Sequence, residues 1–132
     1  MFAASRFKAE ISKHFDAVFK RRGFVSERDS SWESQMRGLG IRMRSPEFRL
    51  QAFWDRGSIS MEVAPLVQTD AWFDSDWFNF NQLLSWLGHK DTDTNTRILA
   101  NSLDVAYAAI AEFLSDRGLE ARERYMQSVV GY

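Results

Sequence analysis

Apolar and polar residues alternate through the middle of the chain, and this period of two constrains the fold more than any other feature. Between residues 47 and 63 every second side chain is apolar on either side of an Asp55-Arg56-Gly57 break. The alternating set is Phe48, Leu50, Ala52, Trp54, Ile59, Met61 and Val63. Such a pattern is typical of antiparallel strands with one buried face. The sequence therefore predicts an antiparallel meander.

Two tight turns would give this meander a single apolar face. Two-residue turns at Ser45-Pro46 and Arg56-Gly57 place apolar residues opposite one another in both hairpins. The predicted partners are Met43 and Phe48, Ile41 and Leu50, Trp54 and Ile59, Ala52 and Met61, and Leu50 and Val63. A weaker alternation over residues 32–43 changes parity around Gly38, which indicates a turn or bulge. We expect three or four strands.

Helical periodicity lies on both sides of the meander. It predicts a first helix from Ala4 to Arg22, and later helices at about residues 76–87, 96–117 and 119–130. The inward face of the second helix would carry Trp77, Phe80, Leu83, Leu84 and Leu87. The predicted fold is a single α+β domain over residues 1–132. It has an N-terminal helix, a three- to four-stranded antiparallel meander and three C-terminal helices packed on one sheet face.

Composition excludes several classes of function. The chain has no cysteine, so disulfide frameworks, cysteine-ligated metals and thiol catalysis are excluded. It contains no apolar run of membrane-spanning length and no signal-peptide core, so we expect a soluble, cytoplasmic protein without membrane contact. The calcium-like start at Asp91-x-Asp93-x-Asn95 lacks the required glycine and the closing glutamate. We therefore expect no metal and no cofactor.

The polar face of the meander is rich in arginine. In the predicted register Arg42 lies opposite Arg49, Arg44 lies opposite Glu47, and Phe53 lies beside them. Like charges that face each other destabilise a sheet unless an anion or a carboxylate lies between them. Two interpretations stay open: a solvated charged face in which Glu62 neutralises Arg49, or a site for an anion or an acidic partner.

Large aromatic residues outside the predicted core suggest a second surface. Phe78 and Trp86 fall on the outward side of the predicted second helix, and Trp72 lies in the loop before it. Later helices could cover these side chains. Left uncovered, they would form a patch that binds a protein partner or a second copy of the chain.

Several short segments resemble those of small bacterial α+β proteins of uncharacterised function, some of which are immunity proteins. The segments are Arg22-Gly-Phe24, Asp55-Arg-Gly-Ser-Ile-Ser-Met-Glu-Val-Ala-Pro65, Phe73-Asp74 and Leu83-Leu-Ser-Trp-Leu-Gly88. The resemblance implies an α+β fold and, for immunity proteins, a role in binding and blocking a toxin. It brings no catalytic residue with it.

Three functions remain after these exclusions, and the favoured one is a non-catalytic bacterial protein-interaction domain, immunity-like in type. Its predicted partner-binding residues are Arg42, Arg44, Arg49, Phe53, Trp72, Phe78 and Trp86. The first alternative is a nucleic-acid or phosphate-ligand binder that uses the same arginines; the formal net charge of -1 disfavours nucleic acid. The second is a small enzyme in which Glu62, His14 or His89 lies in a sheet-helix cleft. No catalytic motif supports it.

The charge is unevenly distributed along the chain. Residues 1–56 contain twelve Lys and Arg against seven Asp and Glu, whereas residues 57–132 contain five against eleven. This asymmetry either steers a partner or lets the two parts of the fold attract each other.

Overall fold

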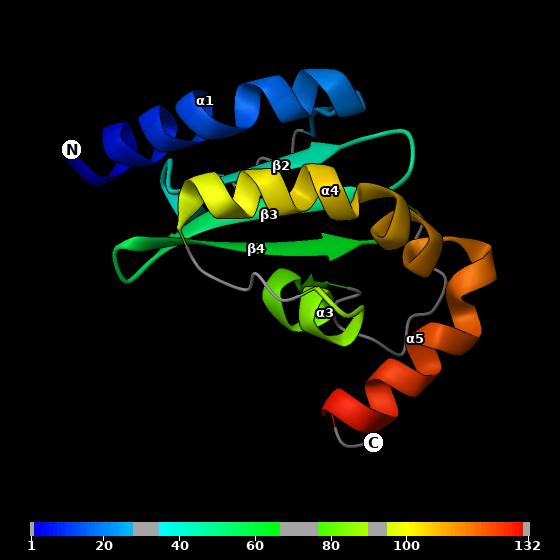
Figure 1. Ribbon diagram of the computed structural model, residues 1–132. Coiled ribbons are helices and arrows are strands. Elements are labelled where there is room, and N and C mark those ends of the chain that lie inside the picture. Colours follow the sequence, from blue (N-terminus) through cyan, green and yellow to red (C-terminus); the bar gives the residue numbers. More distant parts are fainter. Residues whose placement is uncertain (1, 28–34, 67–76, 90–94, 131–132) are drawn as a thin grey trace.

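The computed structural model describes residues 2–27, 35–66, 77–89 and 95–130. Its elements form one α+β arrangement, so the predicted class is confirmed (Figure 1). The strands are β1 (Val25–Ser26), β2 (Gly40–Arg44), β3 (Arg49–Asp55), β4 (Ser58–Ala64) and β5 (Phe78–Asn79). The α-helices are α1 (Phe2–Arg22), α3 (Phe80–Trp86), α4 (Thr96–Leu114) and α5 (Leu119–Tyr125). A 3₁₀ turn at Asp116–Gly118 precedes α5, and a π-helical turn at Met126–Val130 follows it.

The sheet is antiparallel, with the strand order β1-β2-β3-β4-β5. It therefore has five strands rather than three or four, because two-residue strands pair at both edges. In Figure 1, α1 and α4 lie together along the sheet, α3 lies beside β4, and α5 leads away from the end of α4. Side chains of α1 and α4 bury the inner face of the sheet. The central core residues include Phe7, Phe15, Leu50, Val63, Leu103 and Ile110.

The second hairpin has the predicted register. Trp54 pairs with Ile59 and Leu50 with Val63 across β3 and β4. Arg56 and Gly57 form the turn with φ angles of 54° and 87°. Two successive positive φ angles suit the right-handed twist of a two-residue hairpin.

The first hairpin has a different register from the one predicted. Ser45 donates its backbone N–H to the carbonyl of Phe48, so the turn residues are Pro46 and Glu47 rather than Ser45 and Pro46. Proline favours the first central position of such a turn and is disfavoured at the second. The Ser45 hydroxyl also accepts the N–H groups of Glu47 and Phe48, which stabilises the turn. The one-residue displacement shifts each pairing by two residues, so Met43 lies opposite Leu50.

Two other predicted elements need correction. The alternation over residues 32–43 predicted an extended segment, but Gln35 and Met36 are helical, so the prediction is wrong at these two residues. Residues 32–34 lie outside the described residues. The second helix begins at Phe80 rather than near residue 76, because Asn79 caps it by accepting the N–H of Gln82. The two residues before Phe80 are extended and pair with β4.

Gly118 allows the chain to turn sharply between α4 and α5. A Cβ built at this position would lie 2.0 Å from the carbonyl oxygen of Phe113. We expect Gly118→Ala to lower the free energy of unfolding, measured by urea titration, by about 3 kcal/mol. The added methyl group would clash with backbone atoms, which cannot move away as the end of a flexible side chain could. Gly88→Ala is the matched control, since Gly88 has φ +91° but no atom within 4 Å of an added Cβ. It should cost about 1 kcal/mol in the same urea titration. Equal costs for the two variants would contradict the clash.

Candidate functional site

The outer face of the sheet holds the arginines that the sequence singled out, but with different neighbours. Arg44 lies opposite Arg49, and Arg42 lies opposite Gln51. The predicted pairs of Arg42 with Arg49 and of Arg44 with Glu47 are therefore wrong, because of the shifted turn. The pairing of Gln51 with Glu62 is as predicted.

The charge of Arg49 is neutralised by Glu27. Arg49 Nη2 lies 2.5 Å from Glu27 Oε1, and Arg49 Nε lies 3.0 Å from Oε2. The two side chains are only 16% and 21% exposed. Glu27 directly follows β1, and its backbone N–H donates to the carbonyl of Arg42, which continues the pairing with β2. The neutralising carboxylate is thus Glu27 rather than Glu62. A strand of two residues is too short to show a periodic signal in the sequence.

A chain of hydrogen bonds crosses the same face. Arg42 Nε donates to Gln51 Oε1 at 2.9 Å, and Gln51 Nε2 donates to Glu62 Oε1 at 2.5 Å. Gln51 is 6% exposed although it lies on the polar face. A buried amide without hydrogen-bond partners would be costly in free energy, so Gln51 keeps both bonds. These bonds in turn hold Arg42 and Glu62 in one rotamer each.

Trp77 packs against two of the arginines. The guanidinium carbons of Arg42 and Arg49 lie 5.3 Å and 4.9 Å from the centroid of its ring. Cations at this distance from an indole face are attracted by its quadrupole. Trp77 therefore belongs to the outer face. Its predicted place on the inner face of a helix is wrong, because residues 78–79 form a strand before α3 starts.

The remaining predicted residues of this face differ in exposure. Arg44 is exposed, and its Nη2 lies 3.4 Å from the carbonyl oxygen of Leu66. Phe53 is partly buried beside Gly40 and Ser60. Trp72 lies outside the described residues. We define the outer face by Arg42, Arg44, Arg49, Phe53 and Trp77.

Phe78 and Trp86 do not form an exposed patch. Both pack edge-on against Phe113 of α4 and Tyr125 of α5, with ring centroids 5.3–5.7 Å apart. Phe78 lies opposite Val63 in the sheet, so its side chain joins the core side. Later helices cover these aromatics, which was one of the two interpretations open from the sequence. Both side chains are partly buried, and their role in binding a partner stays a prediction.

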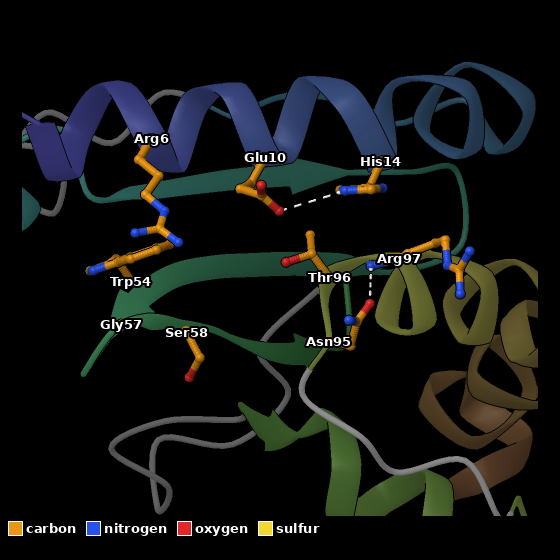
Figure 2. Close-up of a pocket in the computed structure, with 9 residues that line it drawn as sticks. All are labelled: Arg6, Glu10, His14, Trp54, Gly57, Ser58, Asn95, Thr96 and Arg97. Atoms are coloured by element: carbon orange, nitrogen blue, oxygen red, sulfur yellow. Dashed lines mark hydrogen bonds and ion pairs between the residues drawn. The ribbon is translucent and has the colours of Figure 1, made fainter.

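A second polar feature is a pocket between α1, the tip of the β3–β4 hairpin and the start of α4 (Figure 2). Its volume is about 360 Å³, a size suited to a small molecule. The lining residues are Arg6, Glu10, His14, Trp54, Gly57, Ser58, Asn95, Thr96 and Arg97. No motif in the sequence indicates that these three segments meet.

Three ionisable residues of the pocket come from one side of α1, and a fourth, Arg97, comes from α4. Arg6, Glu10 and His14 are spaced by four, so they follow one another along the helix. His14 Nε2 lies 3.6 Å from Glu10 Oε2, and the guanidinium of Arg6 lies 5.7 Å from the Trp54 ring centroid. Figure 2 shows all three side chains directed from α1 toward the hairpin and the start of α4.

The three residues named for an enzyme do not come together. His14 lines the pocket, Glu62 bonds Gln51 on the outer face, and the backbone N–H of His89 donates to the carbonyl of Leu84 at the end of α3. Within residues 2–27, 35–66, 77–89 and 95–130, no group of three His, Asp or Glu side chains could hold a metal ion.

No single helix of the described chain is long and apolar enough to cross a membrane; α4 and residues 116–129 meet the length and composition test only as a pair bent by 77°. No family model, curated protein or solved structure matched the chain. The resemblance to bacterial α+β proteins therefore stays a prediction.

The Glu27–Arg49 pair should contribute strongly to stability. We expect Arg49→Ala and Glu27→Gln each to lower the free energy of unfolding by about 2 kcal/mol, because each leaves a mostly buried group without its partner. A double-mutant cycle measured by urea titration should give a coupling of about 1–3 kcal/mol. The exposed pair of Arg124 and Glu120 is the control, with a coupling of about 0.5 kcal/mol or less. A coupling of about 0.5 kcal/mol or less between Glu27 and Arg49 would show that this pair does not contribute strongly to stability.

Tyr125 should make stability depend on alkaline pH. Burial raises the pKa of its hydroxyl above the ordinary value of 10.0, because the phenolate loses hydration. The native state therefore holds this proton more tightly than the unfolded chain does. Its contribution is fully present below pH 10 and is lost as pH rises further. The free energy of unfolding of the wild type should therefore fall relative to that of Tyr125→Phe as pH rises above about 10 in urea titrations. A constant difference would show that Tyr125 does not titrate in this way.

Proposed function

We propose that the chain is a non-catalytic domain that binds a protein partner through the outer face. The observation that carries this proposal is the packing of two guanidinium groups against Trp77, beside the exposed Arg44. Arginine and tryptophan are the residue types that most often dominate binding energy in protein interfaces.

The outer face is also held in one conformation before any partner arrives. Glu27 fixes Arg49, and Gln51 fixes Arg42, so these long side chains have already lost much of their rotamer freedom. Binding then costs less ordering entropy than it would for free arginines. Arg44 is the exposed cation of this set, so we expect the partner to present a carboxylate to it.

Nucleic acid is the less favoured ligand for the same surface. Phosphate binding depends on cations that release counterions, and Arg49 is already neutralised by Glu27. The formal net charge of -1 also gives no general attraction to a polyanion. An immunity-like role against a toxin is the specific form of protein binding that the sequence resemblance suggests.

Charge reversal at Arg44 tests the proposal. A tagged wild-type chain should capture a partner protein from lysate of its native cells, and Arg44→Glu should reduce that capture about tenfold by replacing an attraction with a repulsion. Lys13→Glu is the control, because Lys13 is an exposed cation on α1. Quantitative mass spectrometry of the captured proteins gives the ratio.

Two outcomes would overturn the proposal. One is equal capture by Arg44→Glu and Lys13→Glu variants that fold as the wild type does. The other is a bound species that nuclease treatment removes, which would favour the nucleic-acid alternative.

A further inference from the structure

Few side chains attach the C-terminal helix to the rest of the described chain. We call residues 119–129, which comprise α5 and most of the π-helical turn, the arm. Of the seven residues of α5, Tyr125 alone is buried, at 2% exposed, whereas Leu119 is 58% exposed. Ala121 and Met126 are partly buried against the core. A segment with so few buried contacts can detach at a small cost in free energy.

Three aromatic rings from other elements enclose the ring of Tyr125. Its centroid lies 5.5 Å from that of Phe78 in β5, and 5.6 Å from those of Trp86 in α3 and Phe113 in α4. All three contacts are edge-on, a favoured geometry for aromatic pairs. We call these three side chains the aromatic cage. Because the cage contains no residue of the arm, it fits the Tyr125 ring of another copy as well as its own.

Residues 115–118, which we call the hinge, bend the chain between α4 and the arm. The segments on either side are inclined by 77°, and Figure 1 shows α5 leading away from the end of α4. The hydroxyl of Ser115 accepts the N–H of Arg117 and donates to the carbonyl of Glu112. Arg122 donates to the carbonyl oxygens of Phe113 and Ser115. Local hydrogen bonds therefore stabilise the bend.

The same residues could instead continue α4 as a straight helix. The last carbonyl groups of α4 would then accept the N–H groups four residues later in place of the Arg122 side chain. The main-chain bonds gained would offset the side-chain bonds lost. Tyr125 would lie about 18 Å from Phe113 along the axis of a straight helix, beyond the reach of its own cage.

We propose that the arm exchanges between two copies of the chain. In this domain-swapped dimer the hinge is straight, and the Tyr125 ring of each copy fills the aromatic cage of the other. The occupant is a second copy because the contact of Tyr125 with the cage already exists within one chain, so no new complementary surface is needed. The exchange involves neither Arg44 nor the rest of the outer face.

Gly118→Ala tests the role of the hinge. An added Cβ would lie 2.0 Å from the carbonyl oxygen of Phe113 in the bent form, whereas alanine is favoured over glycine within a straight helix. Both effects act in each copy, so the dissociation constant of the dimer should be at least about a hundred times lower than for the wild type. Analytical ultracentrifugation of chains refolded at a series of concentrations measures it. Gly88→Ala, the same change outside the hinge, should keep the wild-type value.

Ser115→Ala is a milder hinge variant that brings no clash. It removes the hydroxyl bonds with Arg117 and Glu112, which exist only in the bent form, so the dissociation constant should fall about tenfold. This variant keeps the test decisive if Gly118→Ala does not fold. Adding Tyr125→Ala to either hinge variant should raise the dissociation constant at least about tenfold, because the ring that fills the cage is lost.

Cross-chain contacts in the dimer identify the exchanged segment. Equal amounts of ¹³C-labelled and unlabelled chains of the hinge variant are unfolded together and refolded at high concentration. An isotope-filtered NOE experiment should then show contacts between the Tyr125 ring of one chain and the Trp86 indole of the other.

Three results would overturn the inference. The first is that both hinge variants dimerise no more strongly than the wild type and Gly88→Ala. The second is a dimer without cross-chain contacts between Tyr125 and Trp86, which would show that the copies associate through another surface. The third is a dimer of a hinge variant that Tyr125→Ala does not weaken.

Discussion

The hydroxyl of Tyr107 on α4 donates to the hydroxyl oxygen of Ser45 at 2.8 Å, and the geometry of the whole outer face depends on that contact. Ser45 is 3% exposed, so its oxygen has no water to replace Tyr107 or the backbone N–H groups that it accepts. These bonds hold the turn at Pro46–Glu47. Because each residue of turn displacement shifts the strand pairing by two, a helix on one side of the sheet fixes which arginines meet on the other. Arg44 lies opposite Arg49 for this reason.

The same junction links the two parts of the chain that carry opposite charge. The rings of Phe24, Phe48 and Tyr107 pack together with centroids 5.0–6.0 Å apart. Arg22, at the end of α1, lies over the Tyr107 ring at 4.7 Å and donates through Nε to Asp104 at 2.9 Å. A basic residue of the first part and an acidic residue of the second thus stabilise one cluster. Part of the charge asymmetry therefore serves the fold itself rather than a partner.

The sequence predicted which side chains share a face, because parity survives a register shift of two residues. It did not predict the shift, because turn position depends on the bonds of one serine and the preference of one proline rather than on periodicity. Short elements also lie beyond pattern analysis. Glu27 follows a strand of two residues, and Trp77 precedes another, so neither had a period to reveal its neighbours. The sequence therefore predicted correctly that the three arginines share the polar face of the sheet. It did not predict that Glu27 neutralises Arg49 or that Trp77 packs against Arg42 and Arg49.

Pairing separates two kinds of arginine in this chain. Arg49 is mostly buried, neutralised by Glu27 and stacked on Trp77, so its substitution would act on a partner indirectly, by releasing the ring that it supports. Arg44 is exposed and has no carboxylate partner within the described chain, so under the proposed function its substitution would act on the partner directly. A buried cation that is paired with a carboxylate stabilises the side chains around it, whereas an exposed cation without such a pair can attract an acidic group of a partner.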